Sequence, residues 1–373
     1  MNQSVTPPRP VGRPRKVVAE TQPLLRTTPS VRSVDWLTPA FGAADGYGKS
    51  AEQMALELER QSVRVQLVGL VRPAGNVTAR NIFQRRPIGA GDAIVFYSQP
   101  TSWMPQSGRK SYGFTMYEAD PLPDLWRPYF SRVDEIWVPS KWLVDVFARA
   151  SGRAVHHIPL GVDAAAFHGK LRTRGKTLRF LHFTTLGSET RKGVDLAIAA
   201  FRAAFGNRDD VSLTLRSSIP YRATDVVDHR IRHHNGPMTP AQLTELYHEH
   251  DALLYPSRGE GFGLIPLEAM ATGMPSIFAD ASGMADYASL GLSVPAIPAR
   301  AQVGVGRSTG LATSAAERST WFEPDLAALV DRLREVDRDY DRVAAEAYAN
   351  AATIADEWSW QRTGAAILER LKA

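Results

Sequence analysis

Short apolar runs alternate with amphipathic segments along most of the chain, beginning near residue 33. The run "SVDWLTPAF" has the pattern of a buried strand, and the glycine-rich turn "GAADGYG" follows it. The next segment, "KSAEQMALELERQ", has the period of a helix, with Met54, Ala55 and Leu58 on one side, and "VRVQLVGLV" predicts a second strand. Strands and helices in this alternation indicate a parallel sheet covered on both faces.

The alternation occurs twice, which predicts two Rossmann-like domains of the doubly wound α/β class. The first covers residues 33–165 and the second residues 166–350, with a C-terminal helix over residues 351–373 that packs back on the first domain. Within the second domain, Thr239 stands where it can cap the helix "PAQLTELYHEH". Domains of this kind bind ligands at the carboxyl ends of their strands, so we expect the site in the cleft where the two domains face each other.

Residues 1–32 differ in composition from the rest. Six basic residues and one acid account for the whole net charge of +5, and six prolines accompany few large apolar residues. Such a segment cannot bury enough apolar surface to fold alone, so we expect a disordered basic tail.

The composition also excludes some chemistry. The chain has no cysteine, so it holds no disulfide, zinc–cysteine site or thiol nucleophile. No apolar run reaches the roughly 18 residues of a membrane-spanning helix. We therefore expect a soluble, cytoplasmic protein without a membrane span.

The segment "EGFGLIPLE" carries the most chemical information. Glu260 and Glu268 bracket two glycines and the predicted start of a helix. Glycines let the backbone approach a ligand closely, and the unpaired N–H groups of a helix start favour anionic oxygens. A carboxylate at each end of the segment can accept hydrogen bonds from sugar or ribose hydroxyls.

This segment resembles the signature of the family-four retaining glycosyltransferases of GT-B fold, two glutamates separated by seven residues. The likeness continues through "RKGVDLAIAAF", "WVPSKWLVDVF", "IPLGVDAAAF" and the closing "WSWQRTGAAILERL". It implies a metal-independent enzyme that moves a hexose or pentose from a nucleotide sugar, of the UDP- or GDP-sugar type, to a hydroxyl. The first domain would bind the acceptor and the second the donor, with no further cofactor.

The resemblance also implies roles for single residues. Glu260 would lie against the donor sugar and Glu268 would hold the ribose. The other expected donor contacts are the backbone N–H groups of Gly261, Phe262, Gly263 and Leu264, the nucleobase neighbours Gly236 and Met238, and the first-domain glycines Gly46 and Gly48.

The donor diphosphate needs positive charge. By the same resemblance Lys192 neutralises it, helped in the family by an arginine about six residues earlier. Leu186 stands at that position here, so Arg191 and Arg216 are the two candidates for this role. Fixed cations and helix N-termini can stabilise the charge that develops on a leaving phosphate without a metal.

The acceptor is expected at residues 102–126, which follow the strand "AIVFYS". This aromatic and basic connection can stack on an acceptor and hydrogen-bond it, or its aromatic side chains can simply pack the loop. The candidates are Glu118 before all others, then Trp103, Arg109, Lys110 and Tyr112.

Three other motifs have plainer interpretations. "GYGKS" lacks the glycine that a phosphate-binding P-loop needs five places before Gly48, because Ala43 stands there. "DRD", residues 337–339, falls within a charged amphipathic helix, and the two pairs of adjacent histidines point apart on a strand or helix. We predict no metal site.

The tail contains a segment that resembles an AT-hook, in which an extended Gly-Arg-Pro core lies in the minor groove of A·T-rich DNA. Val11 departs from the motif, which has an arginine there. The matching residues are Gly12, Arg13, Pro14, Arg15 and Lys16.

The two resemblances together favour transfer of a sugar to a hydroxymethylated base in double-stranded DNA, as some bacteriophages do, in which case the compartment is the host cytoplasm. A base in a duplex must be flipped out to reach such a site. One alternative is a glycan, lipid or protein acceptor. Another is a protein that binds DNA or sugar nucleotides without turnover.

Overall fold

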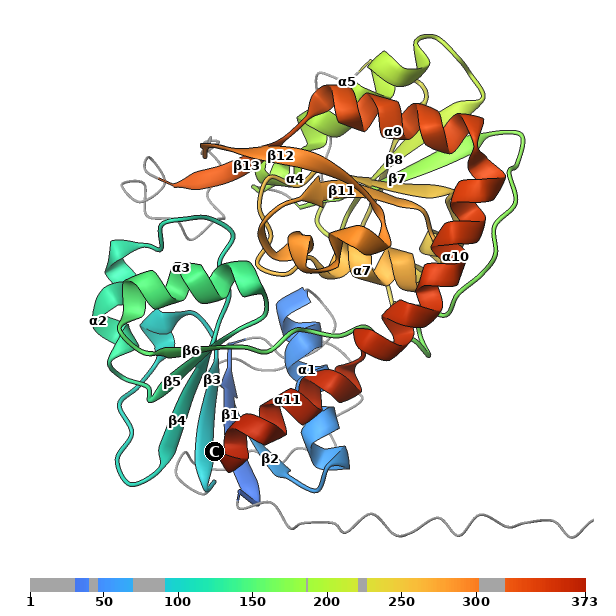
Figure 1. Ribbon diagram of the computed structural model, residues 1–373. Helices are drawn as coiled ribbons and strands as arrows, with labels where there is room; N and C mark the ends of the chain where they lie inside the picture. Colours follow the sequence, from blue (N-terminus) through green and yellow to red (C-terminus); the bar gives the residue numbers. More distant parts are fainter. Residues whose placement is uncertain (1–30, 40–45, 70–90, 186, 221–226, 302–318) are drawn as a thin grey trace, which may run out of the picture.

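The structure, a computed structural model, describes residues 31–39, 46–69, 91–185, 187–220, 227–301 and 319–373. Two α/β domains make up these residues, and each is built on its own sheet (Figure 1). Within the described ranges no helix is long and apolar enough to cross a bilayer. The predicted tail motif, with Gly12, Arg13, Pro14, Arg15 and Lys16, lies outside the described residues.

The first domain contains a six-stranded parallel sheet in the order β2-β1-β3-β4-β5-β6. Its strands are β1 (Ser33–Thr38), β2 (Arg64–Gly69), β3 (Ala93–Tyr97), β4 (Lys110–Phe114), β5 (Glu135–Val138) and β6 (Ala154–His157). Its helices are α1 (Gly46–Arg60), α2 (Arg127–Phe130) and α3 (Lys141–Ser151).

The second domain contains seven strands in the order β13-β12-β11-β10-β7-β8-β9, and all pairs are parallel except β12 with β13. The strands are β7 (Leu178–Thr184), β8 (Val211–Ser217), β9 (Ile231–Asn235), β10 (Ala252–Tyr255), β11 (Ser276–Asp280), β12 (Leu292–Arg300) and β13 (Thr320–Pro324). The helices are α4 (Glu189–Lys192), α5 (Val194–Phe205), α6 (Pro240–Glu249), α7 (Leu264–Ala271), α9 (Leu326–Arg338) and α10 (Tyr340–Glu357).

Local sequence explains where helix α6 begins. The Thr239 hydroxyl accepts a hydrogen bond from Gln242 N, and the Gln242 side chain reaches back to Thr239 N at 2.9 Å. Pro240 is the first helical residue. Proline lacks an N–H, and it is tolerated there because the first N–H groups of a helix have no partner within the helix. The predicted cap at Thr239 is confirmed.

The sequence predicts one long connection over residues 102–126, but the structure places strand β4 within it. The strand runs between β3 and β5 in the middle of the sheet. Gly113 makes room there for the ring of Trp103, because a Cβ on Gly113 would lie 2.4 Å from that ring. Strand β4 therefore divides residues 102–126 into a segment before it and a segment after it.

The chain crosses between the domains twice, and the crossings lie together (Figure 1). Val162 N, after β6, donates to Trp358 O, at the end of α10, over 2.7 Å. Next to this contact, a Cβ on Gly161 would fall 2.3 Å from Trp360 N. After this point helix α11 (Trp360–Lys372) runs along the first domain.

The expected C-terminal helix over residues 351–373 is divided between the domains. Helix α10 packs against α7 of the second domain and ends at Glu357. Helix α11 packs against α1, where Gly364 lies on Glu57, and Arg370 pairs with Glu135 at 2.8 Å. Ser359 starts α11 by accepting a hydrogen bond from Arg362 N.

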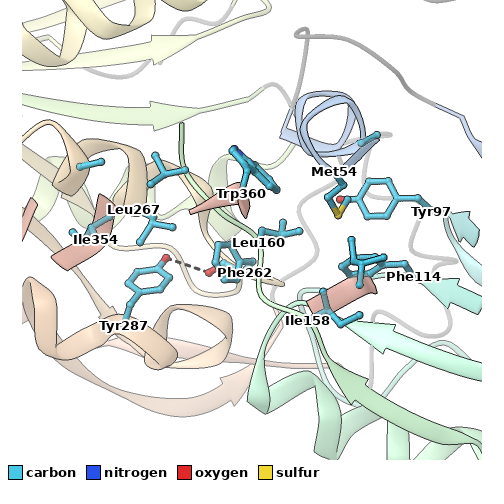
Figure 2. Packing of buried hydrophobic residues seen from close by; sticks show 14 of the residues in the cluster. Met54, Tyr97, Phe114, Ile158, Leu160, Phe262, Leu267, Tyr287, Ile354 and Trp360 are labelled. Atoms are coloured by element: carbon cyan, nitrogen blue, oxygen red, sulfur yellow. Dashed lines mark hydrogen bonds between the residues drawn. The ribbon is translucent and has the colours of Figure 1, made fainter. Parts of the chain in front are cut away.

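One apolar core runs from domain to domain (Figure 2). Met54 and Phe114 of the first domain belong to the same buried cluster as Phe262 and Leu267 of the second, with Leu160 of the first crossing between them. The two domains therefore pack directly on each other, and the segment after β4 contacts the segment after β10, because a Cβ on Gly259 would lie 2.2 Å from Glu118 O.

Candidate active site

The loop that carries Glu260 lies between the two domains. It follows β10 and ends at Gly263, whose positive φ of 92° starts helix α7. A Cβ on Gly263 would meet the Tyr287 hydroxyl at 2.4 Å, and a Cβ on Gly261 would meet Met116 of the first domain at 2.8 Å. Only glycine fits at these two positions, which supports the close backbone approach inferred from the sequence.

The side chain of Phe262 is part of the core, and its ring packs against Tyr287 (Figure 2). The Tyr287 hydroxyl donates to the carbonyls of Phe262 and Gly263. Phe262 therefore contributes only its backbone to the site. The first N–H groups of α7, from Leu264 onward, have no partner within the helix, as at any helix start.

Glu260 is the centre of a buried cluster of charges. Its Oε1 atom accepts hydrogen bonds from Lys192 Nζ at 2.6 Å, Ser257 Oγ at 2.7 Å and the Tyr255 hydroxyl at 2.9 Å. Arg191 Nη1 lies 3.4 Å from the same oxygen. Burial alone would raise the pKa of Glu260, but Lys192 and Arg191 outweigh burial and hold the pKa at about 2.

The two cations of this cluster respond differently. Burial lowers the pKa of Lys192, and the charge of Glu260 offsets only part of that effect. Burial also acts to lower the pKa of Arg191, yet Glu118 and Glu260 raise it overall. Lys192 also donates to the Tyr255 hydroxyl at 2.5 Å. The site thus holds two positive groups beside two carboxylates.

Local structure fixes these cations in place. Arg191 and Lys192 end the short helix α4, and Gly193 follows with a φ of 73°. A Cβ on Gly193 would lie 2.0 Å from Pro256 O, so the residue after Lys192 must be glycine.

Arg258 also supports the cluster. Its N–H donates to Arg191 O at 2.7 Å, and its guanidinium binds Asp195 and Glu323. The sequence reading did not select Arg258.

Glu268 has a partner from the other domain. One turn into α7, its Oε1 accepts a hydrogen bond from Lys49 Nζ at 2.5 Å, and its Oε2 accepts one from the Tyr247 hydroxyl at 3.3 Å. Lys49 lies on α1, with its ammonium 4.2 Å from the centre of the Phe167 ring. The sequence reading named neither Lys49 nor Tyr247, although Lys49 directly follows Gly48 in the first-domain glycine loop.

The glycines of that loop start helix α1 next to the start of α7. A Cβ on Gly46 would lie 3.6 Å from Leu264 Cδ1, and Gly48 is buried one residue before Lys49. The starts of two helices, one from each domain, therefore meet beside Glu268.

Arg216, Gly236 and Met238 lie together at the carboxyl end of β8. Arg216 Nε is 3.1 Å from Met238 Sδ, and Arg216 also donates to the carbonyls of Ser217 and His234. Gly236, with a φ of 113°, donates its N–H to Ser217 O at 3.1 Å. The two candidate arginines thus separate: Arg191 is in the Lys192 cluster, whereas the Arg216 guanidinium contacts Met238, Ser217 and His234.

Glu118 is the one acceptor candidate that lies beside this cluster. It follows β4 at the carboxyl edge of the first sheet, with Oε1 4.0 Å from Arg191 Nη2. A Cβ on Gly259 would lie 2.2 Å from Glu118 O, so the two loops are in contact.

The structure removes the other four acceptor candidates from this surface. Trp103 and Tyr112 have 0% and 1% of their surface exposed and pack in the core. Arg109 and Lys110 lie at the amino edge of the sheet, where β4 begins, and Arg109 pairs with Asp35 at 2.6 Å. The physical reason is strand β4, which carries residues 110–114 away from the site.

The described residues contain no group of three or more His, Cys, Asp or Glu side chains that could hold a metal ion. In the "DRD" segment, Asp337 pairs with Arg208 and Arg174, and Asp339 pairs with Arg338. These aspartates therefore form ion pairs with arginines. That the reaction needs no metal stays a prediction.

Comparisons with known proteins agree with this geometry. A family model described as "Family 4 Glycosyltransferase in conflict systems" matches residues 140–367. A D-inositol 3-phosphate glycosyltransferase of Gordonia bronchialis is 33% identical over 35% of this chain and 23% of its own length. The corresponding protein of Paenarthrobacter aurescens is 26% identical over 57% of this chain and 50% of its own length. The chain thus matches half or less of these curated relatives.

Solved structures share the fold. WaaG, a glycosyltransferase of lipopolysaccharide biosynthesis, superposes with a TM-score of 0.64 at 14% identity, over 91% of this chain and 100% of its own. Sucrose-phosphate synthase from Thermosynechococcus elongatus gives 0.62 at 13% identity, over 91% and 98%. Anabaena HepE, solved with UDP and glucose, gives 0.61 at 15% identity, over 91% and 99%. The predicted GT-B fold of two Rossmann-like domains is confirmed.

Proposed function

The chain belongs to the family-4 glycosyltransferases of conflict systems, and from this premise we propose that it moves a sugar from a nucleoside-diphosphate sugar to a hydroxyl with retention of configuration. One observation carries the proposal: Lys192 and Arg191 converge on Glu260 beside the start of α7. Such a site offers fixed positive charge and backbone donors to a diphosphate, and a carboxylate to a sugar.

The reaction breaks two bonds and forms two. The bond between the anomeric carbon and the diphosphate breaks, and the acceptor oxygen bonds to the same face of that carbon. The proton of the acceptor hydroxyl passes to the leaving phosphate. Lys192, Arg191 and the N–H groups at the start of α7 stabilise the charge that builds on the diphosphate, and losing one such donor typically costs about 10²- to 10³-fold in rate.

Glu260 serves this reaction as an ionised group. A carboxyl whose pKa is about 2 carries no proton at neutral pH, so Glu260 is not the proton donor. Its charge holds Lys192 and Arg191 in position, and its oxygens accept hydrogen bonds from the donor sugar. We assign it an electrostatic and positioning role.

Glu268 binds the ribose of the donor. Its two oxygens have one partner each, Lys49 and Tyr247. An ionised carboxylate has about four acceptor positions, so ribose hydroxyls can bind without displacing either partner. Gly236 and Met238 then lie on the side of the nucleobase, and Gly46 and Gly48 on the side of the phosphates.

Glu118 faces the acceptor. It is 39% exposed at its side chain and stands at the edge of the Arg191 cluster, which supports this role. A carboxylate there can accept a hydrogen bond from an acceptor hydroxyl and orient it toward the anomeric carbon.

For the acceptor itself we propose a hydroxymethylated base in double-stranded DNA, supported by the basic AT-hook-like composition of residues 1–32. The names of the curated relatives favour a different acceptor, a phosphorylated cyclic polyol. Both present the hydroxyl that the reaction needs.

A transfer assay tests the reaction and the acceptor together. The protein is incubated with UDP- and GDP-hexoses and with hydroxymethylated duplex DNA, the same duplex unmodified, or inositol 3-phosphate, and products are read by mass spectrometry. Sugar on the hydroxymethylated duplex alone supports the DNA acceptor, and sugar on inositol phosphate alone overturns it. If no donor is consumed with any acceptor or water, the chain binds without turnover and the proposed activity is wrong.

A further inference from the structure

Arg216 differs from two other arginines of the same domain, Arg191 and Arg258. Only 4% of its surface is exposed, yet no carboxylate of the described residues lies within ion-pair distance. Arg191 and Arg258, by contrast, each pair with acidic side chains. Burial lowers the pKa of Arg216, and the guanidinium keeps its charge at neutral pH.

Neutral acceptors hold this guanidinium in one orientation. Met238 Sδ lies at Nε, and the carbonyls of Ser217 and His234 lie at Nη1. The Nη2 group makes no hydrogen bond within the described part of the chain, so it has donors to offer. A buried, oriented and uncompensated cation of this kind suits a ligand that brings acceptor atoms.

The neighbours of Arg216 show which part of a ligand it meets. Tyr247, whose hydroxyl binds Glu268, acts to raise the pKa of Arg216 against the effect of burial. Lys192 instead interacts with Glu260, Arg191 and Glu118. Arg216 is thus next to Met238, and the tyrosine that acts on its charge is the one that binds Glu268.

We propose that Arg216 selects the donor's nucleobase by donating a hydrogen bond from Nη2 to the ring carbonyl at position 4 of a pyrimidine or position 6 of a purine. This inference rests on the proposed function, since it takes Glu268 as the ribose site. Uracil, guanine and hypoxanthine present a carbonyl oxygen where cytosine and adenine present an amino group. An amino group facing the guanidinium leaves two donors opposed and both unpaired, which a buried site rejects strongly.

Two matched pairs of ligands test the proposal by titration calorimetry. UDP carries an oxo group where CDP carries an amino group, and IDP and ADP differ in the same way; in each pair the neighbouring ring nitrogen carries a proton only in the oxo base. We expect wild-type protein to bind the oxo nucleotide of at least one pair more tightly than its amino partner, by about tenfold or more. Equal affinities within both pairs would overturn the proposal.

Variants separate base selection from a general structural effect. In Arg216→Met, the preference falls to about twofold or less, because the amino nucleotides lose nothing when the mismatched donor is removed. Arg216→Lys, which keeps a cation, retains part of the preference. The control is Arg230→Met, which removes another buried arginine of the same domain, one paired with Asp228. It leaves the preference intact.

The outcomes distinguish this proposal from the one on which it rests. If Arg216→Met weakens UDP and CDP by the same factor, Arg216 binds a shared part of the donor and the base-selection proposal is wrong. If wild-type protein binds none of the four nucleotides, the proposed donor class itself is wrong. If Arg230→Met also abolishes the preference, the loss is structural and the assignment to Arg216 fails.

Discussion

Glu260 and Glu268 are similarly buried, at 8% and 5% exposure, but their cations come from different places. Glu260 is held by Lys192 and Arg191 of its own domain, which lie 68 and 69 residues before it in the chain. Glu268 is held by Lys49 of the other domain. The sugar end of the site is therefore built within one domain, whereas the ribose end depends on the contact between two.

This contrast predicts that a change at Glu260 affects mainly turnover, whereas a change in the Lys49–Glu268 pair affects mainly the free energy of unfolding. Glu260→Gln should lower turnover about 100-fold or more while changing donor affinity only a few-fold, because the ionised carboxylate acts on the reacting sugar and its cations. Turnover is measured as donor consumption and affinity by calorimetry. Glu249→Gln, an exposed change on α6, is the control. Full activity in Glu260→Gln would remove this residue from the mechanism.

The position of Lys192 and Arg191 beside Glu260 depends on the backbone at Gly193, which a substitution can disturb. Gly193→Ala places a Cβ against Pro256 O at a φ of 73°, so we expect a loss of about 3 kcal/mol in the free energy of unfolding and a loss of turnover. Gly152→Ala has a similar φ of 62° but no atom within 4 Å, and should cost only about 1 kcal/mol. Equal costs in urea unfolding would show that the close approach to Pro256 is unimportant.

The interdomain pair is tested by Lys49→Met. Removing the ammonium leaves Glu268 buried without its cation, which should cost about 2 kcal/mol in the free energy of unfolding, since Lys49 is 18% exposed at its side chain. Arg149→Met breaks an exposed pair with Asp120 and should cost less than about 1 kcal/mol. The double variant Lys49→Met, Glu268→Met should recover part of the loss. A Lys49→Met protein as stable as Arg149→Met would contradict a structural role for this pair.

The smallest expected effect is on stability at acid pH. The pKa of Glu260 falls from 4.5 to about 2 on folding, so its ionised form stabilises the fold above pH 4.5, and this contribution is lost as the pH falls toward 2. We expect the free energy of unfolding of Glu260→Gln to decline less steeply than that of wild type between pH 4.5 and pH 3. Parallel declines in urea titrations at both pH values would show that the Glu260 pKa is not lowered.

A different contrast, between patterns within one short segment and contacts between distant segments, explains what the sequence could predict. The alternation of strands and helices, and the segment around Glu260, depend on neighbours in the chain, so the fold and this loop were predictable. Lys49 and Glu268 are 219 residues apart, and nothing in the "GYGKS" segment indicates that its lysine meets a glutamate of the other domain.

The acceptor side shows the limit in another way. Aromatic and basic residues in 102–126 suggested one binding loop, but composition does not tell in which direction the chain runs. Tyr112, on strand β4, and Trp103, which packs against Gly113 of that strand, lie in the core, and Arg109 lies just before the strand begins. Glu118 remained at the site because it follows the carboxyl end of that strand.

The central claim is that this site activates a nucleotide sugar with retention, and it can be measured before any acceptor is known. Water serves as the acceptor, and proton NMR follows which anomer of glucose appears first when the protein hydrolyses UDP-glucose or another α-linked donor. The account predicts the α anomer first, with release abolished in Lys192→Met. Initial release of the β anomer would contradict it.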